Sequence, residues 1–326
     1  RQIQRWNDHI RPNGFTELDK QAHKMMILYI LAKYEEQDHG AQLNWRALIE
    51  GGIFEFMHRI ILTDIKPPIY HELMRVHGRK LNAWIYSQLE RRVPELDKVF
   101  FDKLKRWFDY PEENRLEKKL LRAAHYLATQ WEFGIIYHFN QAIYGIDATK
   151  AAIESNIEDH YDLAGVQKIS LKGKTSKFID LVGQLRFQKR WAQSPRVPET
   201  SVMGHVLIVA ILGYFCAAEL GACDERIVND FLCGLFHDLP EVLTRDIISP
   251  VKTSVEGLDD LIKDIKKRQV AEKLLPLLPW GWHEEIIYFT QNEFTNRIML
   301  DGVPTKVSEA DLNGKYNVDG LSLIHI

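Results

Sequence analysis

Apolar residues recur at three- and four-residue spacing along most of the chain, which is the pattern of helices that bury one face. Alternation of apolar and polar residues, which would indicate strands, is nearly absent. The clearest helical segments are residues 23–31, 100–108, 116–133, 202–220 and 226–236. The sequence therefore predicts an all-α protein.

A basic segment of little apolar periodicity, residues 165–177 (GVQKISLKGKTSK), divides this pattern into two halves. Its two glycines and its lysines are typical of a linker or an exposed loop. A length of 326 residues fits two domains at roughly 100–200 residues each. We therefore place a boundary near Gly173, with one domain at residues 1–172 and a second at residues 173–326.

Two segments that lie 182 residues apart are similar to each other. They are Gly52 to Ile69 (GIFEFMHRIILTDIKPPI) and Gly234 to Val251 (GLFHDLPEVLTRDIISPV). The same offset carries His23 onto His205. Repetition at this length indicates duplication of a whole domain. We therefore predict two tandem helical bundles.

The two copies differ at the positions where chemistry would be expected. The first half has Glu55 and Phe56 where the second has the pair His237-Asp238. We therefore interpret residues 1–172 as a degenerate copy without a catalytic metal site, in a packing, regulatory or ligand-sensing role.

Composition limits the classes of partner. The formal net charge of −3 gives no broad basic field, so binding of bulk nucleic acid is not expected. No apolar run approaches the roughly 20 residues that span a bilayer, so no membrane association is expected. The three cysteines lack CxxC spacing, and no secretory signal opens the chain, so we expect a cytoplasmic protein. The oligomeric state, including a homo-oligomer, is left open.

Candidate chemistry gathers in the second half. Imidazole and carboxylate groups together suit divalent transition metals, and His237 and Asp238 can reach one ion from a single helical turn. Glu241 follows on the same side of that turn. His205 comes from a preceding helix about 30 residues earlier, which suits two antiparallel helices that meet at the ion. We therefore predict a metal site at His205, His237 and Asp238.

The order of these motifs resembles that of a known family. Arg190-Trp191, Gly204-His205, the run FHDLPEVLTRD at residues 236–246 and SPVK at residues 249–252 occur in sequence. This order resembles the HD superfamily of phosphohydrolases, and within it the bacterial HD-domain 5′-deoxyribonucleotidases. The resemblance covers about residues 186–260 strongly.

The resemblance implies one divalent ion (Co, Mn, Mg, Zn or Fe) that activates a water molecule. Glu241 and Asp246 would be the catalytic residues, one orienting or deprotonating the water and the other assisting it or protonating the leaving alkoxide. Arg190 would hold phosphate oxygens, and Trp191 would shape the sugar or base pocket. A fourth metal ligand is open: it is Asp311, in the run SEADL, or a residue beyond position 326 if the sequence is truncated there.

The implied function is that of a phosphomonoesterase for a small-molecule substrate, a (deoxy)ribonucleoside 5′-monophosphate. Two alternatives stay open at this point. The same site could hydrolyse a signalling nucleotide, or the protein could be a nucleotide-sensing regulatory or binding protein with little turnover. Metal-dependent release of phosphate distinguishes an enzyme from a regulator.

Overall fold

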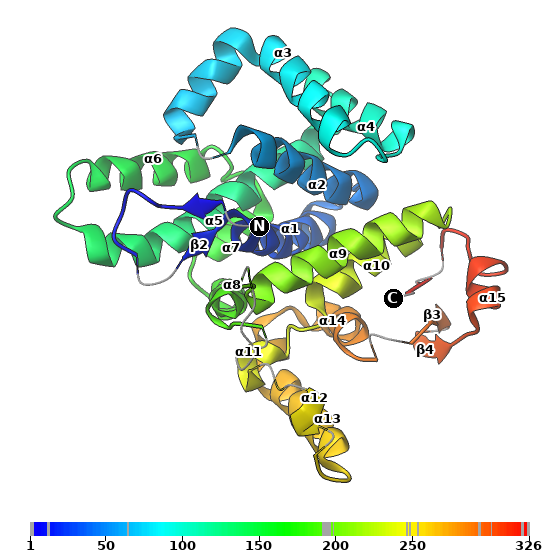
Figure 1. The fold of residues 1–326 in the computed structure, drawn as a ribbon. Helices are drawn as coiled ribbons and strands as arrows, with labels where there is room; N and C mark the ends of the chain where they lie inside the picture. The colour runs from blue at the N-terminus through cyan, green and yellow to red at the C-terminus, as the bar shows by residue number, and fades with distance from the viewer. Residues whose placement is uncertain are drawn as a thin grey trace.

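The computed structural model describes residues 3–11, 14–63, 65–190, 197, 199–245, 247, 249–252, 254–292, 295–300, 302–320 and 323–324. Within these ranges the chain is mostly helical (Figure 1), as the apolar periodicity predicted. Short strands, which the sequence pattern did not predict, form two small antiparallel sheets at the edges of the helical body. They are β1 (Gln4–Arg5) with β2 (Phe15–Thr16), and β3 (Arg297–Leu300) between β4 (Val303–Lys306) and β5 (Leu323–Ile324).

The first half of the chain contains eight α-helices among the described residues. They are α1 (Glu17–His39), α2 (Trp45–Leu62), α3 (Pro67–Arg92), α4 (Lys98–Asp109), α5 (Arg115–Asn140), α6 (Ile146–Glu158), α7 (Ala164–Ser170) and α8 (Lys174–Gly183). A 3-10 turn at Gln184–Phe187 leads into the second half.

The described part of the second half has shorter helices. They are α9 (Val202–Glu219), α10 (Asp224–Phe236), α11 (Glu241–Thr244), α12 (Ser249–Lys252), α13 (Leu258–Gln269), α14 (His283–Thr290) and α15 (Glu309–Asn313). A π-helical turn at Val270–Leu274 and 3-10 turns at Leu275–Leu277 and Trp280–Trp282 connect α13 to α14.

The prediction of a linker at residues 165–177 is wrong. The segment forms α7 and the start of α8, and it buries Val166 and Ile169 in the main core. The lysines of this segment are at least partly exposed. Its basic composition therefore belongs to the outer face of packed structure and does not indicate a linker. The proposed domain boundary falls in the turn between α7 and α8 and stays a prediction.

One hydrophobic core joins the two halves. Tyr29 of α1 packs its ring edge-on against Phe236 at the end of α10, with 5.1 Å between ring centroids. In Figure 1, α1, α9 and α10 lie together in the centre of the molecule. In the second half α9 packs along α10, whereas in the first half α1 packs mainly along α5. The tandem duplication is therefore still a hypothesis from sequence.

Capping side chains fix where the two central helices begin. Thr16 accepts a hydrogen bond from the backbone N–H of Asp19 and starts α1, and Ser201 does the same for Gly204 at the start of α9. The Ser201 hydroxyl also donates to the Asp19 carboxylate. This hydrogen bond connects the first turns of α1 and α9.

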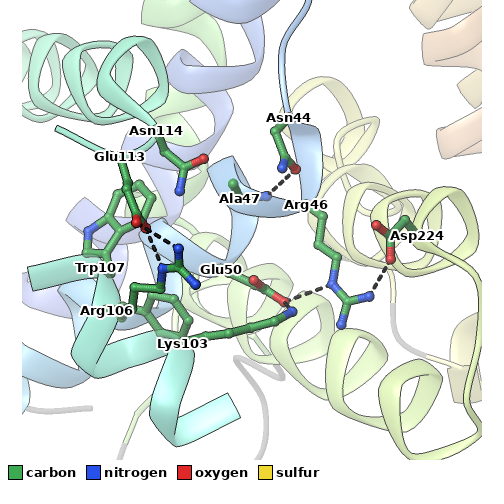
Figure 2. Close-up of a pocket in the computed structure, with 11 residues that line it drawn as sticks. Asn44, Arg46, Ala47, Glu50, Lys103, Arg106, Trp107, Glu113, Asn114 and Asp224 are labelled. Atoms are coloured by element: carbon green, nitrogen blue, oxygen red, sulfur yellow. Dashed lines mark hydrogen bonds and ion pairs between the residues drawn. The ribbon is translucent and has the colours of Figure 1, made fainter. Parts of the chain in front are cut away.

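A polar pocket of about 280 Å³ lies where α2 and α4 meet the start of α10 (Figure 2). Glu50 of α2 accepts hydrogen bonds from Arg46, Lys103 and Tyr214, each at 2.8 Å. Arg46 also pairs with Asp224 at the first residue of α10. These ion pairs form a second connection between the halves.

Among the described helices, α9 has the length and apolar composition that a membrane span would need. Core helices of water-soluble proteins commonly meet the same criteria. Val202, Met203, Val206 and Ala210 of this helix are fully buried inside the protein. The helix therefore contributes one face to the core that carries the candidate site.

Candidate metal centre

The predicted ligands come together at the junction of α9 and α10. His205 lies in the first turn of α9, and His237 and Asp238 follow directly after α10. Their ligand atoms all lie within 4.8 Å of one another. The Asp238 Oδ2 atom is 3.3 Å from His237 Nε2 and 3.6 Å from His205 Nε2. The structure thus places the three side chains where the sequence predicted a metal site.

These separations suit a shared ion. Nitrogen and oxygen ligands at about 2.0–2.2 Å from one metal ion lie roughly 3–3.5 Å from each other. The edge from Asp238 to His237 is 3.3 Å, within this range, and the edge from Asp238 to His205 is 3.6 Å, just above it. The Nδ1 atom of His237 bonds to the Gly234 carbonyl at 2.8 Å, which orients the ring with Nε2 toward Asp238. Two imidazoles and one carboxylate are a donor set for a divalent transition metal. The residues present therefore fit such an ion.

Asp238 is held as a carboxylate. Burial raises its pKa, but the hydrogen bond and charge of His237 and the charges of Arg190 and His205 outweigh burial, so the pKa lies well below its ordinary value. Arg190 donates from Nη1 to Asp238 Oδ2 at 2.9 Å. The backbone N–H of Arg190 bonds to the Thr200 carbonyl, just before α9, which fixes this arginine beside the cluster.

Glu241 lies one turn beyond Asp238, at the start of α11, with only 2% of its surface exposed. Its Oε1 accepts from the ammonium of Lys266 on α13 at 2.5 Å, and its backbone carbonyl accepts from the Gln188 side chain at 3.1 Å. Its carboxylate is not part of the triangle of ligand atoms. Glu241 is therefore a buried, oriented acidic group next to the ligands.

Lys266 is a site residue that sequence reasoning missed. It belongs to the basic run Lys266-Lys267-Arg268 at the end of α13, which is the usual composition of a solvated helix C-terminus. Only the fold, which packs α11 against α13, shows that one of these cations turns inward.

The sequence also predicted roles at this site for Trp191, Asp246 and Asp311. Trp191 and Asp246 lie outside the described residues. Asp311 is exposed in α15, where it bonds to Ser308. Asn313, two residues after Asp311, accepts a hydrogen bond from Arg226 in the first turn of α10. This helix is about 20 Å long, and His237 follows its other end. Asp311 is therefore not a ligand of this cluster.

Residues 182–319 match the sequence model of the HD domain. This range contains His205, His237, Asp238 and the residues that surround them.

Residues 182–319 form an HD domain.

Curated relatives share part of this domain. A 5′-deoxynucleotidase of Vibrio parahaemolyticus is 31% identical over 124 residues, which is 36% of this chain and 61% of the relative. A 5′-deoxynucleotidase of Vibrio atlanticus is 26% identical over 129 residues (38% and 65%), and one of Photobacterium profundum 28% over 116 residues (34% and 58%). The chain thus spans about three fifths of the length of these relatives. No solved structure is significantly similar to it.

Gly234 lets the two helices of the HD domain approach closely enough for the ligands to meet. A Cβ atom there would lie 2.6 Å from the Ala210 Cα of α9. We expect Gly234→Ala to separate α10 from α9, to cost about 1–3 kcal/mol of unfolding free energy, and to weaken metal binding about tenfold. Urea unfolding and metal titration measure both effects.

The matched control is Gly134→Ala in α5, where a Cβ meets nothing within 4 Å. Alanine loses less backbone entropy than glycine when the helix forms, so this change should raise stability slightly. Wild-type stability and metal affinity in Gly234→Ala would show that the close approach of α9 and α10 is not needed.

Proposed function

We propose that this protein is a metal-dependent phosphohydrolase whose HD domain releases phosphate from (deoxy)ribonucleoside 5′-monophosphates. The observation that carries the proposal is the triangle of His205, His237 and Asp238 inside the matched HD domain. The relatives that share this domain are named 5′-deoxynucleotidases, which supports a nucleoside monophosphate as the substrate.

A divalent ion in the triangle would lower the pKa of a bound water molecule and shield the approach of an anionic substrate. Arg190 is the candidate for binding the substrate. Its guanidinium reaches the cluster at Asp238, and a planar guanidinium is the group best suited to hold phosphate oxygens. Arg190 would thus orient the phosphorus atom toward the attacking water.

Glu241 is the candidate for general base. Its side chain is buried, its backbone N–H bonds to the Asp238 carbonyl, and Lys266 holds one of its carboxylate oxygens in place. The carboxylate would take a proton from the attacking water as the bond from phosphorus to the 5′ oxygen breaks, and the departing 5′ oxygen would take up a proton to become the hydroxyl of the nucleoside. The products would be a nucleoside and inorganic phosphate.

The experiment uses the full chain. Metal content is measured by mass spectrometry, and phosphate release is followed for a panel of nucleoside 5′-monophosphates after treatment with EDTA and addition of Mn²⁺ or Co²⁺. We expect hydrolysis that depends on the added metal. Absence of metal-dependent phosphate release from every nucleotide in the panel would overturn the proposal and favour a nucleotide-sensing regulator.

Lys266 should act on turnover through Glu241. We expect Lys266→Met to lower kcat about tenfold, with metal content and KM close to wild type, because the base loses its orienting partner while the ligands stay in place. Lys263→Met on the same helix is the control, since Lys263 pairs with the exposed Asp259. Equal kcat values in the two variants would contradict a positioning role for Lys266.

A further inference from the structure

A second pocket, of about 480 Å³, opens on the surface of the protein between α5, α8 and the 3-10 turn that leads into the second half. We call it the aromatic pocket, after Trp131 of α5 and Phe187 of the turn, which line it. The described residues of its lining include none of the candidate metal ligands. The aromatic pocket is therefore a separate place from the candidate metal centre.

The aromatic side of the pocket is held in place from behind. The Arg186 guanidinium lies 4.7 Å from the centroid of the Trp131 ring, and the His23 ring meets Trp131 edge-on with 5.0 Å between centroids. The Phe187 ring lies 6.1 Å from the Trp131 ring, and their planes differ by 31°. Phe187 is 38% exposed. The two rings thus offer a fixed aromatic surface on which a planar ligand can stack.

Gly134 keeps the middle of the aromatic pocket open. It lies on the same face of α5 as Trp131, three residues away, and it lines the pocket. Glycine destabilises the interior of a helix relative to alanine. Each of the other glycines within the described α-helices has a neighbouring atom within 4 Å of an added Cβ, whereas at Gly134 an added Cβ meets nothing. Packing therefore does not explain this glycine, and space for a ligand does.

Hydrogen-bonding groups surround this aromatic surface. Gln130 and His138 of α5 and Gln184 of the turn line the pocket and are exposed. Within the described part of the chain, their side chains form no hydrogen bond with other protein groups. A glutamine amide carries a donor and an acceptor side by side, and this pair matches the ring nitrogen and exocyclic amine of a base such as adenine. The polar groups therefore suit a heterocycle with its own donors and acceptors.

The charge of the lining favours an uncharged ligand. The described residues of the aromatic pocket include one carboxylate, Asp180, and no lysine or arginine. The polar pocket in Figure 2 gives the contrast, since Arg46, Lys103 and Arg106 line it. Phosphate groups in proteins are commonly held by such cations. A ligand of the aromatic pocket is therefore expected to lack a phosphate.

We propose that the aromatic pocket binds the planar heterocycle of a nucleobase or nucleoside. The ring stacks beside Trp131 and Phe187 and lies over Gly134, and the amides of Gln130 and Gln184 bond to its edge. The inference does not rest on the activity of the HD domain. A free base and a nucleoside share the ring that the pocket recognises, and the experiment below distinguishes them.

The test is isothermal titration of the full-length, EDTA-treated protein with adenine and with 2′-deoxyadenosine. We expect binding that Gly134→Leu weakens by at least about tenfold, because the new side chain fills the place of the ring. The Tm of this variant should equal or exceed that of the wild type, since leucine favours a helix more than glycine does. Ala151→Leu is the control: it adds leucine at an exposed position of α6 and should leave the Kd unchanged. Tighter binding of 2′-deoxyadenosine would show that the sugar also contacts the pocket, and equal Kd values would restrict recognition to the base.

A second pair of variants tests the polar contacts. Gln184→Met keeps the length of the side chain and removes the amide, so it should weaken the binding of adenine about tenfold. Gln141→Met makes the same change at an exposed position outside the pocket and should have no effect. The proposal is overturned if the wild type binds neither adenine nor 2′-deoxyadenosine, if Gly134→Leu or Gln184→Met binds them with the wild-type Kd, or if the two control variants lose binding as well.

Discussion

His237→Ala is expected to remove the bound metal and to lower phosphate release by at least about 100-fold. The change deletes one of three ligands and also the hydrogen bond to Gly234 that orients it. It leaves Asp238 with His205 and Arg190, so an ion would be held by only two described side chains. Metal content by mass spectrometry and kcat/KM with added Mn²⁺ measure the two effects.

The matched control is His39→Ala at the end of α1. His39 is exposed and pairs with Glu35, so its loss should change neither metal content nor rate. A His237→Ala protein that keeps its metal and hydrolyses nucleotides at the wild-type rate would show that the ion lies elsewhere.

Glu132→Gln is expected to destabilise the protein by about 3–5 kcal/mol, the usual cost of removing one member of a buried ion pair. Glu132 is fully buried and accepts from Arg5 and Trp6 at one oxygen and from Arg186 at the other. The glutamine would leave two buried guanidinium groups without their shared carboxylate. The midpoint of urea unfolding at pH 7 measures the loss.

The pH dependence of this effect has a definite sign. Burial raises the pKa of Glu132, but Arg5 and Arg186 outweigh burial and lower the pKa to about 2, from 4.5 when unfolded. The contribution of the carboxylate is therefore complete above about pH 4.5 and is lost as the pH falls toward 2. We expect wild type and Glu132→Gln to converge in stability over this range.

Glu113, which is partly exposed and pairs with the exposed Arg106, provides the comparison. Glu113→Gln should leave the unfolding midpoint almost unchanged, because solvent screens that pair. A constant difference between wild type and Glu132→Gln from pH 7 to pH 2 would contradict the assignment of the acid-sensitive charge to Glu132.

The three candidate ligands could be found from sequence because each stands at a helix end that the sequence marks. Ser201 caps α9 three residues before Gly204, so His205 falls in the first turn. The apolar face of α10 stops at Phe236, so the next two residues leave the core together. Residue type and helix periodicity then place imidazole and carboxylate groups at one junction.

The remaining features depend on packing between distant segments. The pairing of Glu241 with Lys266 requires α13 to fold back over α11, and nothing near either residue indicates that contact. The basic residues at 165–177 were interpreted as a linker because seven- and ten-residue helices show too few turns for periodicity to be recognised. The contact of Lys20 with His125 joins residues 105 positions apart, so it is visible only in three dimensions.

The contact between Tyr29 and Phe236 restricts how such a protein can evolve. Phe236 immediately precedes His237, and its ring forms a cluster of three with Tyr29 of α1 and Phe289 of α14. If recombination transferred the C-terminal half to another polypeptide, the Phe236 ring would lose its contact with Tyr29. We therefore expect the segment that carries the candidate ligands and the helix α1 that packs against it to be inherited together, and substitutions at position 29 to be tolerated only with compensating changes at position 236.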